Sequence, residues 1–80
     1  MPREVILTPE GLEELKSKIE FLSKERRQEV AERIRAAREF GDISENAEYD
    51  DAKNEQAMLE KQISDLEDKL RSATVIDTPP

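Results

Sequence analysis

Two carboxylates near the middle of the chain, Asp42 and Glu45, are the residues best suited to do chemistry. They begin a stretch from Asp42 to Asp51 that holds five acidic residues and no basic one. Carboxylate oxygens are preferred ligands of Mg²⁺, and proteins often supply only one or two of them while water or phosphate completes the shell. Two carboxylates are too few for a tight site of their own, but they can complete a metal site in a partner's active centre.

The spacing of Asp42 and Glu45 has a second interpretation. Acidic residues three apart form a capping box, in which Asp42 caps a helix and Glu45 reaches back to it. Acids at a helix start also interact favourably with the helix dipole. On spacing alone the capping box is the more frequent of the two arrangements. A calcium-binding loop is not indicated, because its alternating ligands and terminal glutamate are missing.

Arg38 and Lys53 are the basic residues that flank the acidic stretch, each within about one helical turn of it. They are either ordinary solvated side chains, with Arg38 bonded to Asp51, or a small contact for a phosphate group. Tyr49 is either a core residue in the first turn of a helix or a stacking group at the tip. Spacing does not decide between these alternatives.

Two long helices must position these residues. Thr8 and Pro9 are typical of a helix start, and a glycine after the last periodic residue is typical of a helix end. The sequence predicts a first helix over about 9–40, a tip over 41–46 and a second helix over about 47–72.

Apolar residues recur three or four positions apart in both helices, which indicates one buried stripe on each. The first stripe comprises Leu12, Leu15, Ile19, Leu22, Val30, Ile34 and Ala37; the second comprises Ala52, Gln56, Leu59, Ile63, Leu66 and Leu70. If the chain folds back at the tip, the stripes match in the pairs Ile19–Leu70, Leu22–Leu66 and Val30–Leu59. The predicted fold class is all-α, a long antiparallel two-helix coiled-coil hairpin.

The first stripe is interrupted between Lys24 and Glu29, where no residue is apolar. It resumes in steps of four, which is typical of a stutter that locally unwinds a supercoil. Arg26 and Gln56 occupy stripe positions, and we interpret them as long stems lying along a thin interface. At the open end of the hairpin the sequence predicts a small apolar cluster of Val5, Ile6, Leu12, Leu15, Val75 and Ile76.

Composition restricts the possible functions of this 80-residue chain, which has the length of one small domain. It contains no cysteine and no histidine, which excludes disulfides, zinc fingers and Cys/His nucleophiles. No apolar run has the length of a membrane span, so we expect a soluble, cytoplasmic protein with no membrane partner. The net charge of −7 falls entirely in residues 41–80, so we expect no independent binding of nucleic acid through a basic face.

The tip sequence is also similar to a known family. The segment Ala37-Arg38-Glu39-Phe40-Gly41-Asp42-Ile43-Ser44-Glu45-Asn46-Ala47-Glu48-Tyr49, followed by Ala52-Lys53, closely resembles the tip signature of bacterial Gre transcript cleavage factors, nearest to their GreA branch. The opening 7–11 and the closing 73–77 resemble the same family. The resemblance implies that 1–80 is the N-terminal coiled-coil domain, without the C-terminal globular domain that follows it in the family.

The resemblance implies an accessory factor rather than an enzyme. Members of the family enter the secondary channel of bacterial RNA polymerase and stimulate its intrinsic cleavage of the nascent RNA 3′ end in backtracked, arrested complexes. By position, Asp42 and Glu45 would be the catalytic acids and would share a Mg²⁺ ion with the polymerase active centre. The chain would carry no cofactor of its own.

By the same resemblance, four residues would contact RNA or polymerase, namely Arg38, Lys53, Asn46 and Tyr49. The first two match a basic spot near the RNA, and the last two match the motif and would support the tip. Two other functions remain open. One is a polymerase-channel inhibitor that does not promote cleavage, and the other is a structural coiled-coil adaptor.

Overall fold

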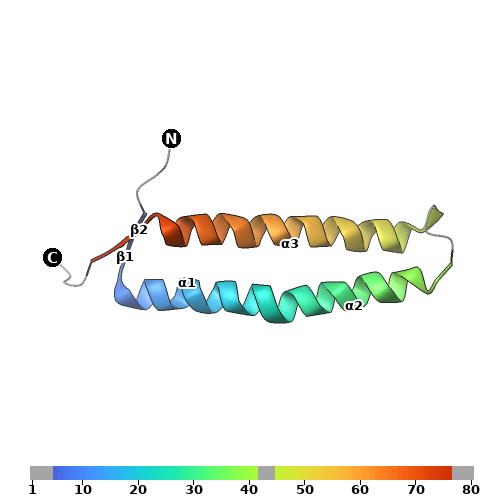
Figure 1. The fold of residues 1–80 in the computed structure, drawn as a ribbon, viewed down its shortest axis with the longest axis horizontal. Helices are drawn as coiled ribbons and strands as arrows, with labels where there is room; N and C mark the ends of the chain where they lie inside the picture. Colours follow the sequence, from blue (N-terminus) through green and yellow to red (C-terminus); the bar gives the residue numbers. More distant parts are fainter. Residues whose placement is uncertain (1–4, 42–44, 77–80) are drawn as a thin grey trace.

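The computed structural model describes residues 5–41 and 45–76, which form a narrow helical hairpin about 59 Å long (Figure 1). The elements in chain order are β1 (Val5–Leu7), α1 (Pro9–Phe21), the π-helical turn η1 (Leu22–Arg26), α2 (Arg27–Arg38), α3 (Ala47–Arg71) and β2 (Ala73–Val75). The first three helical elements form one continuous rod that lies beside α3. The predicted all-α hairpin is therefore confirmed.

Local signals explain where the helices begin and end. The Thr8 hydroxyl accepts a 3.0 Å hydrogen bond from the backbone N–H of Gly11, and Pro9 occupies the first turn of α1. Helix α2 ends at Arg38, two residues before the expected end, and a turn follows. Gly41 then has a φ of 126°, a conformation that residues with a side chain rarely adopt.

The core is a single layer of side chains between the two helices. Val30 and Ile63 are each 1% exposed, and Ala52 is fully buried. The core cluster comprises Leu22, Val30, Ile34, Ala52, Leu59 and Ile63, with Tyr49 and Leu66 packed against it. Leu22, Val30 and Leu59 lie in this cluster and Leu66 packs against it, which is consistent with the predicted pairs Leu22–Leu66 and Val30–Leu59.

The interruption in the first stripe takes the form of the π turn η1. Leu22 and Val30 are eight residues apart, one more than two helical turns, yet both are buried. A π turn, whose hydrogen bonds run to i+5, absorbs one extra residue and keeps both side chains on the same face. The expected stutter is therefore accommodated within η1. Arg26, at the end of this turn, is half-buried, as expected for a long stem at the interface.

The open end of the hairpin carries a feature that the sequence analysis did not predict. Strands β1 and β2 pair in parallel, with Ile6 opposite Thr74, and the Ile76 N–H donates a 2.8 Å hydrogen bond to the Leu7 carbonyl. The predicted apolar cluster forms only in part. Leu15 is buried, but Ile6, Val75 and Ile76 are exposed. Among the described helices, none has the length and apolarity required to cross a membrane.

Candidate functional site at the hairpin tip

The candidate site lies where the rod of α1 and α2 turns back into α3 (Figure 1). Asp42, the first predicted catalytic residue, lies outside the described residues, as do Ile43 and Ser44. Glu45, the second, is exposed and directly precedes Asn46, the N-cap of α3. The N-cap of α3 is Asn46, and the predicted capping box of Asp42 and Glu45 involves a residue outside the described ranges.

Asn46 connects the two helices at the tip. Its Oδ1 accepts a hydrogen bond of 3.0 Å from the backbone N–H of Tyr49, and its Nδ2 donates one of 2.5 Å to the Ala37 carbonyl. The side chain is half-buried, and both of its polar atoms bond within the chain. A contact from Asn46 to RNA or polymerase stays a prediction. Within the chain, its side chain links the start of α3 to the end of α2.

Tyr49 follows in the first turn of α3. Its side chain is half-buried and packs against the core cluster. Of the two interpretations left open by spacing, this placement favours a core residue, because the buried part of the ring is not available for stacking. The predicted contact of Tyr49 with RNA or polymerase is not tested by this placement.

The two predicted basic residues are both exposed. Arg38 is the last residue of α2, and Lys53 lies in the second turn of α3, where its Nζ donates a 3.0 Å hydrogen bond to Gln56 Oε1. Within 5–41 and 45–76, the ion pairs do not include one between Arg38 and Asp51, the pair that the solvated interpretation invoked. Both cations therefore lie on the surface near the tip, one on each helix.

The described residues do not form a metal site of their own. Within these ranges no group of three or more aspartate, glutamate, histidine or cysteine side chains is arranged to hold an ion. Glu45 offers one exposed carboxylate at the end of a rod. That donor set fits an ion whose remaining ligands come from elsewhere, since Mg²⁺ is often held by one or two protein carboxylates.

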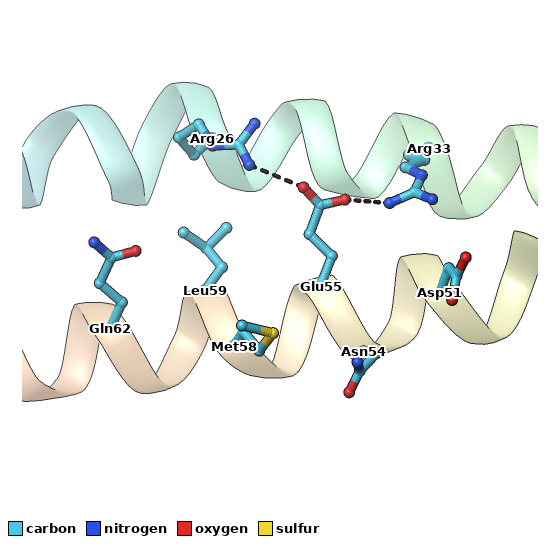
Figure 2. A pocket seen from close by; sticks show the side chains of 8 residues that line it. All are labelled: Arg26, Arg33, Asp51, Asn54, Glu55, Met58, Leu59 and Gln62. Atoms are coloured by element: carbon cyan, nitrogen blue, oxygen red, sulfur yellow. Dashed lines mark hydrogen bonds and ion pairs between the residues drawn. The ribbon is translucent and has the colours of Figure 1, made fainter.

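Cross-helix ion pairs stabilise the hairpin between the tip and the π turn. Glu55 on α3 accepts hydrogen bonds from Arg33 at 2.5 Å and Arg26 at 3.0 Å, both on the opposite rod (Figure 2). These bonds, first from Arg33 and then from Arg26, lower the pKa of Glu55 below its ordinary value. Arg27 likewise lowers the pKa of Glu60. The sequence prediction did not include these pairs, although the predicted register places Arg33 near Glu55 and Arg27 near Glu60 across the hairpin.

An open groove runs beside these ion pairs along one side of the hairpin. It is lined by Arg26, Arg33, Asp51, Asn54, Glu55, Met58, Leu59 and Gln62 (Figure 2). None of the predicted site residues lines it. The groove is shallow and charged, so the tip remains the better candidate for the functional site.

Comparisons with known proteins agree with the tip signature. The family described as "Transcription elongation factor, N-terminal" matches residues 5–75. The chain is 57% identical over 75 residues to the transcription elongation factor GreA of Alkaliphilus oremlandii, covering 94% of this chain and 47% of that protein. It is 56% identical over 77 residues to the GreA of Thermoanaerobacter pseudethanolicus, covering 96% and 49% respectively. The chain thus spans about half the length of the curated relatives it matches.

Proposed function

Because this chain belongs to the family of transcription elongation factor N-terminal domains, we propose that it acts on bacterial RNA polymerase in the cytoplasm. In this proposal the hairpin enters the secondary channel of the polymerase and stimulates its intrinsic cleavage of the RNA 3′ end in backtracked, arrested complexes. The chain is an accessory factor, and the polymerase is the enzyme.

The observation that carries the proposal is the exposed Glu45 carboxylate at the end of a long, thin rod. The hairpin measures about 59 by 27 by 14 Å, dimensions that suit insertion into a channel. Its core is one layer thick and ends in the alanines Ala37 and Ala52, which keep the tip narrow. A purely structural adaptor would not need an exposed acid at this point, whereas a factor that completes a metal site does.

The residues of the tip then have separate tasks. Glu45 and Asp42 supply negative charge for a Mg²⁺ ion shared with the polymerase. Such an ion polarises a phosphoryl oxygen and lowers the pKa of a bound water when it is present. Arg38 and Lys53 donate hydrogen bonds to phosphate oxygens of the RNA, since charge-assisted bonds to phosphate are strong. Glu45 is exposed and precedes α3, whose N-cap is Asn46, and this placement supports the assignment.

The direct test adds the chain to a stalled, backtracked elongation complex in Mg²⁺ buffer and measures shortened RNA. We expect shortening to depend on the chain, on polymerase and on Glu45. The variant Glu45→Gln is compared with Glu14→Gln, a matched loss of one exposed acid near the opposite end of the rod. Equal loss in both variants, or no shortening by the parent at high concentration, contradicts the proposal.

The same assay separates the alternatives. A channel inhibitor slows elongation without shortening the RNA, and an adaptor changes neither quantity. Binding in the channel is measured by competition with an intact family member. This arm shows whether a weak response comes from poor binding or from poor chemistry.

A further inference from the structure

We infer that Asn46 is the positioning residue of the tip, which sets the place of Glu45 by fastening the start of α3 to the end of α2. The inference deepens the proposed function and rests on it for the role of Glu45. The hydrogen-bond geometry itself does not depend on that function.

The first step is that Asn46 uses both ends of its amide. Its Oδ1 accepts from Tyr49 N–H on its own helix, and its Nδ2 donates to the carbonyl of Ala37, nine residues earlier in the chain. An amide is the side chain that offers an acceptor and donors at this length. An aspartate at position 46 would provide acceptors only, and a serine would be too short to bridge the two helices.

The second step concerns the groups that Asn46 satisfies. The first N–H groups of α3 and the last carbonyls of α2 lack partners within their own helices. Tyr49 N–H belongs to the first set and the Ala37 carbonyl to the second. The Ala37 carbonyl also accepts a 3.2 Å bond from Phe40 N–H in the turn, so Asn46 completes an acceptor that faces the tip. The Asn46 side chain thereby caps the start of α3 and donates a hydrogen bond to a carbonyl at the end of α2.

The third step is that the apolar core is thin at this end of the hairpin. Its core positions are Ala37 and Ala52, which are 3% and 0% exposed but bury little side-chain surface. Apolar stabilisation scales with the area removed from water, so it is smallest here. Near the tip, Tyr49 packs against the core cluster and Arg33 forms a 3.6 Å ion pair with the exposed Glu48, while the ion pairs of Glu55 lie about two turns along α3. The bond from Asn46 to the Ala37 carbonyl joins the two helix ends directly, nearer to the tip than these ion pairs, and so helps to hold the ends at one separation.

The consequence for function follows from chain connectivity. Glu45 is joined directly to Asn46, so the clamp limits where its carboxylate can lie relative to the rod. A misplacement of a reacting group by about 1 Å can cost on the order of 10²-fold in rate. Asn46 therefore acts through Glu45, and loss of the clamp should reduce the cleavage rate at saturation without reducing channel binding.

The first experiment uses the unaltered chain and NMR. The Nδ2 protons of Asn46 should exchange slowly and show a through-space contact with the Ala37–Arg38 backbone. The internal reference is Asn54, an exposed residue in the second turn of α3, whose side-chain amide protons should exchange rapidly. Equal exchange for Asn46 and Asn54, with no contact to Ala37, overturns the inference without need of any variant.

The second experiment compares Asn46→Ser with the matched control Asn54→Ser. Serine keeps the cap acceptor, so we expect α3 and the helical content to persist. It loses the donor to Ala37, and we expect the saturating cleavage rate to fall ~10- to 100-fold. Competition for the channel should change less than about twofold, and Asn54→Ser should match the parent in every measurement.

Three other outcomes would contradict the positioning role of Asn46 or the proposed function. If Asn46→Ser cleaves like the parent at saturation, the positioning role is wrong. If it loses channel competition but keeps its saturating rate, Asn46 is a direct contact and the inference is also wrong. If the parent itself promotes no cleavage, the proposed function fails while the NMR measurement still decides whether the clamp exists.

Discussion

Arg27 on α2 and Glu60 on α3 form a two-pronged ion pair across the hairpin, with Nε–Oε2 and Nη2–Oε1 distances of 2.8 Å. Two parallel bonds between a guanidinium and a carboxylate restrict the relative position of the two helices more than a single contact does. A second cross-helix ion pair, Arg33 with Glu55, is joined by a single hydrogen bond and lies one to two turns nearer the tip. Together these pairs keep the helices in one register on the solvent side of a thin core.

The first prediction is that acid weakens the hairpin through these carboxylates. Hydrogen bonds from Arg33 and Arg26 lower the pKa of Glu55 in the folded state, and Arg27 does so for Glu60. A group with a depressed folded pKa contributes stability above its unfolded value, here 4.5, and loses it as pH falls through the folded pKa. The free energy of unfolding in urea should therefore fall below pH about 4.5.

The control for this pH dependence is the double variant Glu55→Gln, Glu60→Gln. It should be less stable than the parent at pH 7 and show a shallower loss below pH 5. Added salt should diminish the difference, because exposed pairs are screened. An unchanged pH profile in the double variant would assign the acid sensitivity to other carboxylates.

The second prediction concerns the core. Ile63 is 1% exposed in the middle of the cluster, and truncation of a buried isoleucine typically costs ~2–5 kcal/mol. In a core one layer thick, Ile63→Ala should strongly reduce helicity and the urea midpoint. Met58→Ala is the control on the same helix, because Met58 is 67% exposed and should change stability by less than about 0.5 kcal/mol. Similar effects for both variants would refute the observed placement of the core.

The third prediction tests the π turn. Deletion of the exposed Glu25 shortens the separation of Leu22 and Val30 from eight residues to seven, which a regular α-helix places on one face. The hairpin should keep its helicity and remain about as stable as the parent. Deletion of the exposed Ala31 in α2 is the matched control, since it rotates Ile34 and Ala37 out of the core by about 100°.

Circular dichroism and urea unfolding measure both deletions. If only the Ala31 deletion unfolds the chain, the π turn η1 serves only to absorb one extra residue between Leu22 and Val30. If the Glu25 deletion is the more damaging, η1 has a structural role of its own that the spacing of Leu22 and Val30 does not explain.

The fourth prediction concerns the two tip acids. Asp42→Asn and Glu45→Gln should each reduce polymerase-dependent cleavage ~10²–10³-fold, as loss of one preorganised electrostatic group commonly does. We expect the larger loss for Asp42→Asn. Glu45→Gln should leave thermal unfolding unchanged, because Glu45 is exposed and outside α3. Arg38→Ala should weaken cleavage mainly through the position of the RNA.

These variants also separate chemistry from binding. Channel competition should stay close to that of the parent for both acid variants. If Asp42→Asn cleaves like the parent, Asp42 has no catalytic part, and a role in ordering the tip is the better interpretation.

The fifth prediction is that the isolated chain binds Mg²⁺ only weakly and does not hydrolyse RNA alone. One or two carboxylates leave most of an octahedral shell to water, so the affinity of the tip by itself should be low. Isothermal calorimetry with Mg²⁺ and incubation with labelled RNA measure the two properties. Tight, saturable binding or hydrolysis without polymerase would contradict the shared-ion proposal.

The sequence by itself determined the hairpin, its two buried stripes and a turn at Gly41, although α2 ends at Arg38, two residues before the predicted end. Apolar spacing is set by the helical repeat, and cap and glycine preferences depend on a few neighbouring residues, so these features can be read locally. The buried positions Leu22, Val30, Leu59 and Ile63 were all predicted on the stripes. The tip signature also predicts Asp42 and Glu45 as the catalytic acids, because that stretch is contiguous, and their role stays a prediction.

Only the tertiary structure decided how the ends and the tip are held. The choice of Asn46 as the cap of α3, and its bond to Ala37, depends on how closely two helix ends approach. Pairing of β1 with β2 joins segments separated by the whole hairpin, and the partners of Glu55 lie on the opposite rod. Such contacts depend on the distance between remote atoms, a quantity that local residue preferences do not contain.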